Sequence, residues 1–75
     1  MTQETPIRPP IRRVALGLLS DYGLVSGDLL VAMVHAETSA DADAIRKTIE
    51  TMQRQGTIYN AAGDADDPEW KVTRP

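Results

Sequence analysis

The sequence predicts a small α+β domain in which three helices are followed by a two-stranded β-hairpin, and three observations support this. Apolar residues recur at intervals of three and four between residues 11 and 52, which is typical of amphipathic helices. After Gly56 the pattern changes to two short runs separated by a polar loop, as expected for paired strands. The chain has 75 residues and no cysteine, so we expect one domain without disulfide bonds or thiolate metal sites.

The first predicted helix covers residues 11–22 of a domain spanning 11–75, and it follows a proline-containing tail or linker at 1–10 that we expect to be flexible. Gly23 is the predicted end of this helix. Gly17 lies inside it, where glycine costs about 1 kcal/mol relative to alanine, and a close crossing by another helix would explain its presence. The apolar stripe of the helix consists of Ile11, Val14, Ala15, Leu18, Leu19 and Tyr22.

The second predicted helix begins at Ser26, a candidate N-cap, and runs to about Glu37. Val25 and Leu30 stand in the two positions of a hydrophobic staple around that cap. The side chains predicted to be buried on this helix are those of Leu30, Met33 and Val34.

A third helix is predicted after a short break at Thr38 and Ser39, and Gly56 ends it. Residues 38–41 have the spacing of a capping box, with Thr38 as the cap and Asp41 as the acid. The predicted apolar stripe of this helix is Ala42, Ile45, Ile49 and Met52.

Two strands are predicted beyond the third helix, at residues 57–60 and 69–73. Trp70 and Val72 lie two positions apart, so they face the same side of the second strand. The loop between the strands, residues 61–68, contains Gly63 and three aspartates. The resulting order of helix, helix, short turn, helix and hairpin is that of a winged helix-turn-helix.

A short run at the end of the third helix is similar to a known family. Arg54, Gly56, Ile58 and Tyr59 form a basic-x-Gly-x-Ile-Tyr pattern that resembles the C-terminal winged-helix domain of archaeal minichromosome-maintenance replicative helicases. The loop that follows is longer and more acidic than in that family. The resemblance implies DNA binding through the third helix and the wing, or a regulatory protein contact made by the same surfaces.

The outward face of the third helix leaves two interpretations open. Its two acids and two bases sum to zero, and each acid lies four residues before a base, an arrangement that stabilises a solvent-exposed helix. The other interpretation is contact with duplex DNA, since glutamine and arginine can bind base edges. The outward face comprises Ala40, Asp43, Ala44, Lys47, Glu50, Thr51 and Arg54. The residues expected to contact DNA are Arg46, Lys47, Gln53 and Arg54.

Further candidate sites lie outside the third helix. Basic residues gather around the start of the first helix and after the wing, and we add Arg12, Arg13 and Lys71 to the candidate DNA contacts, with Arg8 and Arg74 nearby.

The wing loop is acidic, and this favours a protein partner held by the aromatic side chains of Tyr59 and Trp70. Homodimerisation through Leu16, which lies off the stripe of the first helix, is a third possibility. The acids of the wing are Asp64, Asp66, Asp67 and Glu69.

Composition limits the remaining function classes. A net charge of -3 argues against tight nonspecific binding of nucleic acid, so we expect modest, salt-sensitive affinity for double-stranded DNA. The single histidine, His35, has no second ligand nearby, and the wing aspartates lack the glycine and glutamate of an EF-hand loop. We expect no metal, no cofactor and no enzymatic activity, because no catalytic triad or phosphate loop is present. No apolar stretch could span a bilayer, so we expect a soluble, cytoplasmic protein acting in transcription regulation or DNA replication.

Overall fold

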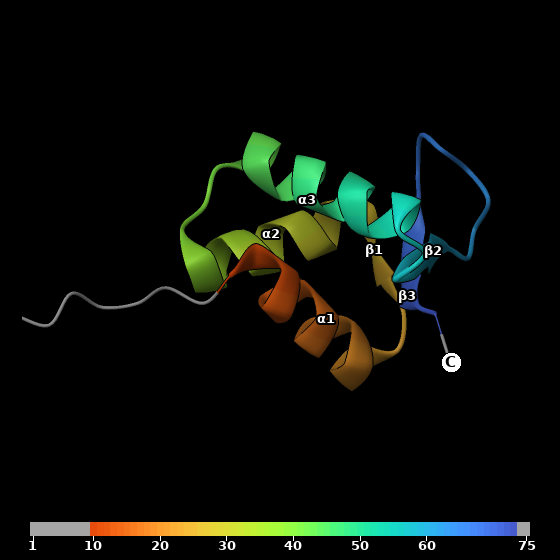
Figure 1. Ribbon diagram of the computed structural model, residues 1–75, viewed down its shortest axis with the longest axis horizontal. Helices are drawn as coiled ribbons and strands as arrows, with labels where there is room; N and C mark the ends of the chain where they lie inside the picture. The colour runs from red at the N-terminus through yellow and green to blue at the C-terminus, as the bar shows by residue number, and fades with distance from the viewer. Residues whose placement is uncertain (1–9, 74–75) are drawn as a thin grey trace, which may run out of the picture.

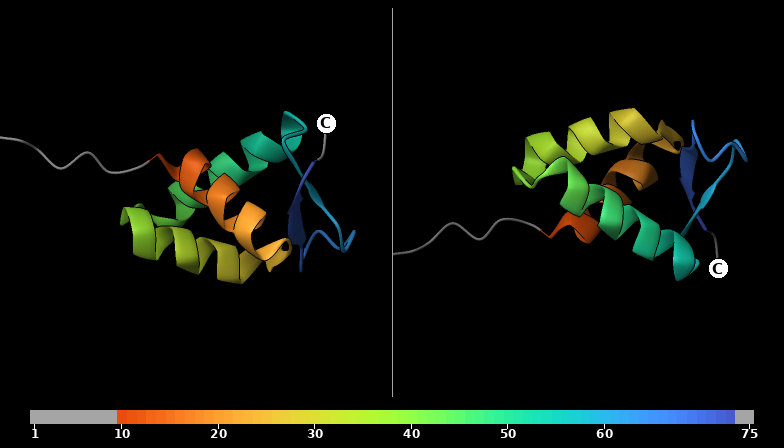
Figure 2. Two further views of the ribbon diagram at one scale, coloured as in Figure 1. Left: turned by 90° about the horizontal axis from the view of Figure 1, so that it is seen from below. Right: turned by 90° about the horizontal axis from the view of Figure 1, so that it is seen from above.

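The computed structural model describes residues 10–73, which form three helices and a three-stranded antiparallel sheet (Figure 1). The helices lie against one another, and the sheet stands at one end of them, opposite the connection between the second and third helices (Figures 1 and 2). The predicted α+β class is confirmed, and the layout is compatible with a winged helix. In chain order the elements are α1 (Ile11–Tyr22), β1 (Val25–Ser26), α2 (Gly27–Thr38), α3 (Ala42–Arg54), β2 (Ile58–Asn60) and β3 (Glu69–Val72).

The sheet has one more strand than the sequence predicts. Its order is β1-β3-β2, and both outer strands run antiparallel to β3. Val25 pairs with Trp70 on one side of β3, and Ile58 pairs with Val72 on the other. The predicted hairpin is present as β2 and β3, and the extended link between α1 and α2 adds a third strand, β1, that the sequence did not indicate.

The start of α2 confirms the cap predicted at Ser26. The Ser26 hydroxyl oxygen accepts a hydrogen bond from the backbone N–H of Leu29 at 3.4 Å. Val25 and Leu30, the predicted staple, are both buried in the core. The helix extends one residue past the predicted Glu37, to Thr38.

The capping box predicted at residues 38–41 is wrong. Thr38 is the last residue of α2, and its hydroxyl donates to the carbonyl of Val34 at 2.8 Å and accepts from the N–H of Ala40 at 3.1 Å. Ser39, with a φ of 61°, turns the chain, and Asp41 caps α3 without a side-chain hydrogen bond. The Thr38 hydroxyl therefore joins the end of α2 to the turn and does not start α3.

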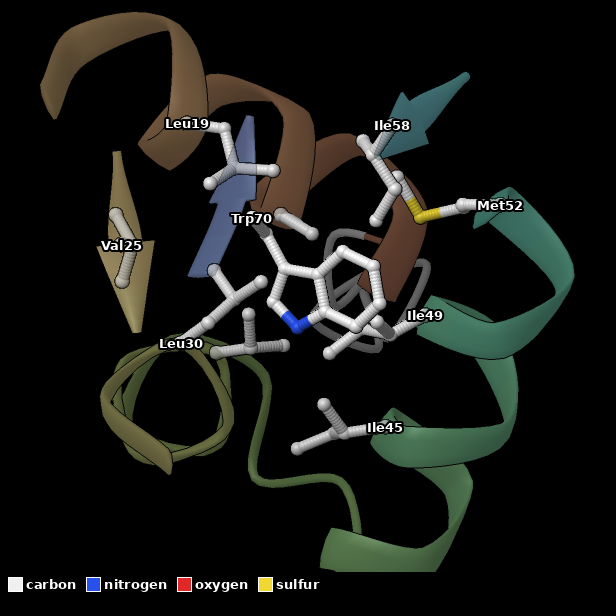
Figure 3. Close-up of a cluster of buried hydrophobic side chains, with 10 residues drawn as sticks. Leu19, Val25, Leu30, Ile45, Ile49, Met52, Ile58 and Trp70 are labelled. Carbon is white, nitrogen blue, oxygen red and sulfur yellow. The ribbon is translucent and has the colours of Figure 1, made fainter. Parts of the chain in front are cut away.

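The core is aliphatic apart from one aromatic ring, that of Trp70. Figure 3 shows this ring among side chains that come from all three helices. All six helices and strands contribute to the core, so the sheet and the helices share one hydrophobic centre. Its buried members are Ala15, Leu19, Val25, Leu30, Val34, Ile45, Ile49, Met52, Ile58 and Trp70.

Several apolar residues differ from their predicted places. Ala40 is not on the outward face of α3, since it lies in the turn before the helix and packs, half-buried, against the core. Tyr22 is 65% exposed, because it closes the last turn of α1 beyond the edge of the core and its hydroxyl remains in water. Ala42 is exposed in the first turn of α3. Leu16, the candidate dimer contact, is half-buried and packs against the core.

Gly17 has no structural partner, so we expect its replacement by alanine to stabilise the domain. It is exposed on α1, and a Cβ atom added there meets nothing within 4 Å, which excludes the close helix crossing suggested above. Gly17→Ala should raise the free energy of unfolding by about 0.5–1 kcal/mol, because alanine loses less backbone entropy in a helix. Urea unfolding followed by circular dichroism measures this change. Gly56→Ala is the control and should be destabilising, since Gly56 has a φ of 80°.

Candidate functional site

The polar face of α3 is divided into two edges of different charge. At about 100° per residue, Lys47 and Arg54 project in nearly the same direction, two turns apart. Arg46, Glu50 and Gln53 project toward α2 and the wing, where all three line one groove. Asp43 is exposed and projects in nearly the same direction as these two cations, whereas Glu50 borders the groove. The outermost side of α3 therefore has two cations and one acid.

Arg12 of α1 reaches the residues that follow the end of α3. Its guanidinium donates to the Gln55 side-chain oxygen at 2.7 Å and to the Thr57 hydroxyl at 3.1 Å. These bonds tie the start of α1 to the junction between α3 and β2, and they use only part of the five N–H donors of the guanidinium. We call Arg12, Lys47 and Arg54 the basic edge. Arg13, the next residue along α1, is exposed.

Lys71 and Tyr59 lie on a different surface. They pair directly across β3 and β2, and both side chains are exposed. Their neighbours along the strands, Ile58 and Trp70, are buried, so the pair occupies the face of the sheet turned away from the helices. The structure does not bring Lys71 to the outer face of α3. Arg8 and Arg74, the remaining predicted cations, lie outside residues 10–73.

A groove of about 560 Å³ separates α3 from the wing loop. Apolar side chains of Val31, Ile49, Pro68 and Trp70 form part of its lining. Three exposed carboxylates, from three separate elements, stand around it. They are Asp28 at the start of α2, Glu50 on α3 and Asp66 in the loop. Among the described residues of the lining, Arg46 is the only cation, so acids predominate, and we call this site the acidic groove.

Asn60 holds the wing loop in shape, a role that the sequence analysis missed. Its side-chain oxygen accepts hydrogen bonds from the backbone N–H groups of Ala62, Gly63 and Glu69 at 3.0, 3.2 and 3.1 Å. Its side-chain nitrogen donates to the carbonyl of Asp64 at 2.9 Å. An asparagine at the end of a strand, three residues before a glycine, is the local signal that could have indicated this turn.

Gly27 fixes the other end of the loop against α2. Its backbone N–H donates to the carbonyl of Pro68 at 2.8 Å. A Cβ atom at this position would lie 2.9 Å from Cγ of Pro68, so only glycine lets the loop approach this closely. The wall of the acidic groove is thus attached to the start of α2 as well as to β2.

Most of the Trp70 side chain is buried, and only its edge borders the acidic groove. Trp70 was expected to anchor a protein partner, but its side chain is only 7% exposed and belongs to the core. The reason is the register of β3, which turns Trp70 toward the helices and Lys71 toward solvent. Tyr59, the other predicted anchor, is 44% exposed and remains available on the outer face.

The wing aspartates and His35 take part in local turns. The Asp64 carboxylate accepts from the N–H of Asp66 at 3.0 Å, and Nδ1 of His35 lies 2.7 Å from the carbonyl oxygen of Ala40. Within residues 10–73, no three His, Cys, Asp or Glu side chains are arranged to hold a metal ion. None of the helices in this part of the chain has both the length and the apolar character needed to cross a membrane.

Comparisons of the chain with protein-family models, with curated proteins and with solved structures found no significant match.

Proposed function

We propose that this chain is a winged-helix module that associates with duplex DNA through the basic edge, in transcription regulation or DNA replication. The observation that carries the proposal is the common direction of Lys47 and Arg54 on α3, with Arg12 joined to the end of the same helix. The resemblance of residues 54–59 to the replicative-helicase domain supports a role in replication.

The arrangement of α2 and α3 supports the choice of α3 as the DNA-contacting helix. The two helices are joined by a three-residue connection, 39–41, and in helix-turn-helix proteins the second helix of such a pair enters the major groove. The outer face of α3 is uncovered, because its residues 46, 47, 50, 51 and 54 are exposed. The sheet order β1-β3-β2, with β1 between α1 and α2 in the chain, is compatible with the layout of a winged helix.

The small number of cations on the basic edge sets the expected strength of binding. Three phosphate contacts predict a slope of about -2.7 in a plot of log affinity against log salt concentration, which is about a 40-fold loss between about 50 and 200 mM salt. The acids of the neighbouring groove oppose phosphate. Binding should therefore be micromolar at low salt and should show little dependence on DNA sequence.

Neutralising the α3 part of the basic edge is expected to weaken duplex binding. The Lys47→Gln, Arg54→Gln double variant should bind a labelled duplex at least about tenfold more weakly in about 50 mM salt, with a salt slope reduced by about two. Fluorescence anisotropy titrations at several salt concentrations measure both quantities.

Lys71→Gln is the control for position, since it removes a cation from the outer face of the sheet. It should leave the affinity for the duplex within about twofold, apart from a small effect of net charge. Absence of binding by the wild-type protein at tens of micromolar in low salt would contradict the proposal. So would a loss of affinity in Lys71→Gln as large as the loss in the double variant.

A further inference from the structure

We propose that the acidic groove is a docking site for a basic, extended segment of a partner protein, with an arginine or lysine side chain as its anchor. The groove is a second surface, separate from the basic edge, and the proposal does not depend on DNA binding. The supporting observations are the charge of the lining, its apolar residues and the fixed position of the wing loop.

The charges around the groove select a cationic occupant. Asp28, Glu50 and Asp66 outnumber Arg46, so the groove keeps an excess of negative charge even if Arg46 neutralises one carboxylate. This charge repels nucleic-acid phosphate and attracts lysine or arginine. The carboxylates come from α2, α3 and the loop, and they do not belong to any metal-binding group among the described residues. An organic cation therefore fits this site better than a metal ion.

The apolar part of the lining favours a side chain over a free cation. Ile49 and Trp70 are buried residues that border the groove, and Val31 and Pro68 are half-buried beside them. Arginine and lysine place their methylene groups on apolar surface while the charged end remains at polar groups. A peptide with apolar residues between its cations can contact more of this surface than the methylene groups of a small polyamine.

The groove is formed before any partner binds. Asn60 makes four hydrogen bonds to the backbone of the wing loop and its base, and Gly27 holds Pro68 against α2. The loop that carries Asp66 is therefore held at both ends. A site that needs little ordering on binding loses less entropy, and a short peptide can then bind with measurable affinity.

Binding of a model peptide tests the proposal. The probe is a nonapeptide in which arginine alternates with valine, titrated into the isotopically labelled full chain and followed by amide NMR. We expect shifts in residues 27–31, 46–53 and 60–68. A second peptide with glycine in place of valine should bind more weakly, because it lacks apolar contacts, and a third with glutamate in place of arginine should not bind.

Two charge-matched double variants identify the surface that binds the peptide. Glu50→Gln with Asp66→Asn neutralises two acids of the groove, whereas Glu37→Gln with Asp21→Asn neutralises two exposed acids outside its lining. The groove variant should lose about fivefold to tenfold in affinity for the arginine–valine peptide, since each partly exposed ion pair contributes modestly. The control variant should stay within about twofold, because it alters only the net charge.

Several results would overturn the proposal. Equal losses in the two double variants would show attraction by net charge alone. Amide shifts confined to residues outside the groove would show that the peptide binds elsewhere. Absence of binding by the arginine–valine peptide would show that the groove is not a docking site for basic segments. A duplex DNA that shifts the groove amides instead of those of the basic edge would assign the groove to nucleic acid.

Discussion

Replacing Trp70 with alanine is expected to lower the free energy of unfolding by about 3–5 kcal/mol. The ring lies among side chains of all three helices, and its strand is the central strand of the sheet (Figure 3). Removing the ring leaves a cavity at the point where the helices meet the sheet. A domain of this size has a total stability of only about 4–11 kcal/mol, so the variant should be close to unfolding at room temperature.

Circular dichroism during urea and thermal unfolding measures this loss of stability. Tryptophan fluorescence cannot be used, because Trp70 is the only tryptophan of the chain and the variant lacks it. Tyr59→Ala is the control because it removes an aromatic ring from the exposed face of the neighbouring strand, and it should cost less than about 1 kcal/mol. If the two substitutions cost the same, Trp70 does not hold the core together.

Replacing Gly27 with alanine is expected to destabilise the domain by about 1–3 kcal/mol, although alanine is a better helix former. The new methyl group would meet the ring of Pro68 at 2.9 Å, and the closed proline ring cannot rotate away as a flexible side chain would. The loop or the start of α2 must then move, and the hydrogen bond from Gly27 to the Pro68 carbonyl is strained. Unfolding midpoints in urea report the cost.

A double-mutant cycle with Pro68→Ala separates this clash from other effects. Pro68→Ala removes the ring atoms that lie against Gly27 and leaves the backbone carbonyl in place. Gly27→Ala should therefore cost at least about 1 kcal/mol less in the Pro68→Ala background than in the wild-type chain. Additive losses would mean that the methyl group is harmful for another reason, such as a changed start of α2.

Features with a local signal were predictable from the sequence. The stripe of α1, apart from Tyr22, and the end of the helix at Gly23 were identified from spacing and residue type, as was the cap at Ser26. The strand β1 was not, because two residues are too few to show a period and its pairing partner Trp70 lies far along the chain. The same limit explains Thr38, whose hydroxyl has the right spacing for a cap but is used by the helix that precedes it.

The candidate site also has a part that could be predicted from the sequence and a part that could not. Lys47 and Arg54 were identified from the periodicity of one helix, which is a property of neighbouring residues. The acidic groove could not be identified, because Asp28, Glu50 and Asp66 come together only when α2, α3 and the wing loop pack. The structural role of Gly27 also could not be predicted from the sequence. Its importance depends on Pro68, which no local pattern connects to it.

The position of β3 has a consequence for the order in which the molecule forms. It is the last strand of residues 10–73, yet within this range both β1 and β2 pair only with it. During synthesis, no part of the sheet can therefore assemble until residues 69–72 have left the ribosome, whereas the helices can begin to collapse earlier. We expect the sheet to appear in a single late step, at a rate governed by closure of the long loop between Val25 and Trp70.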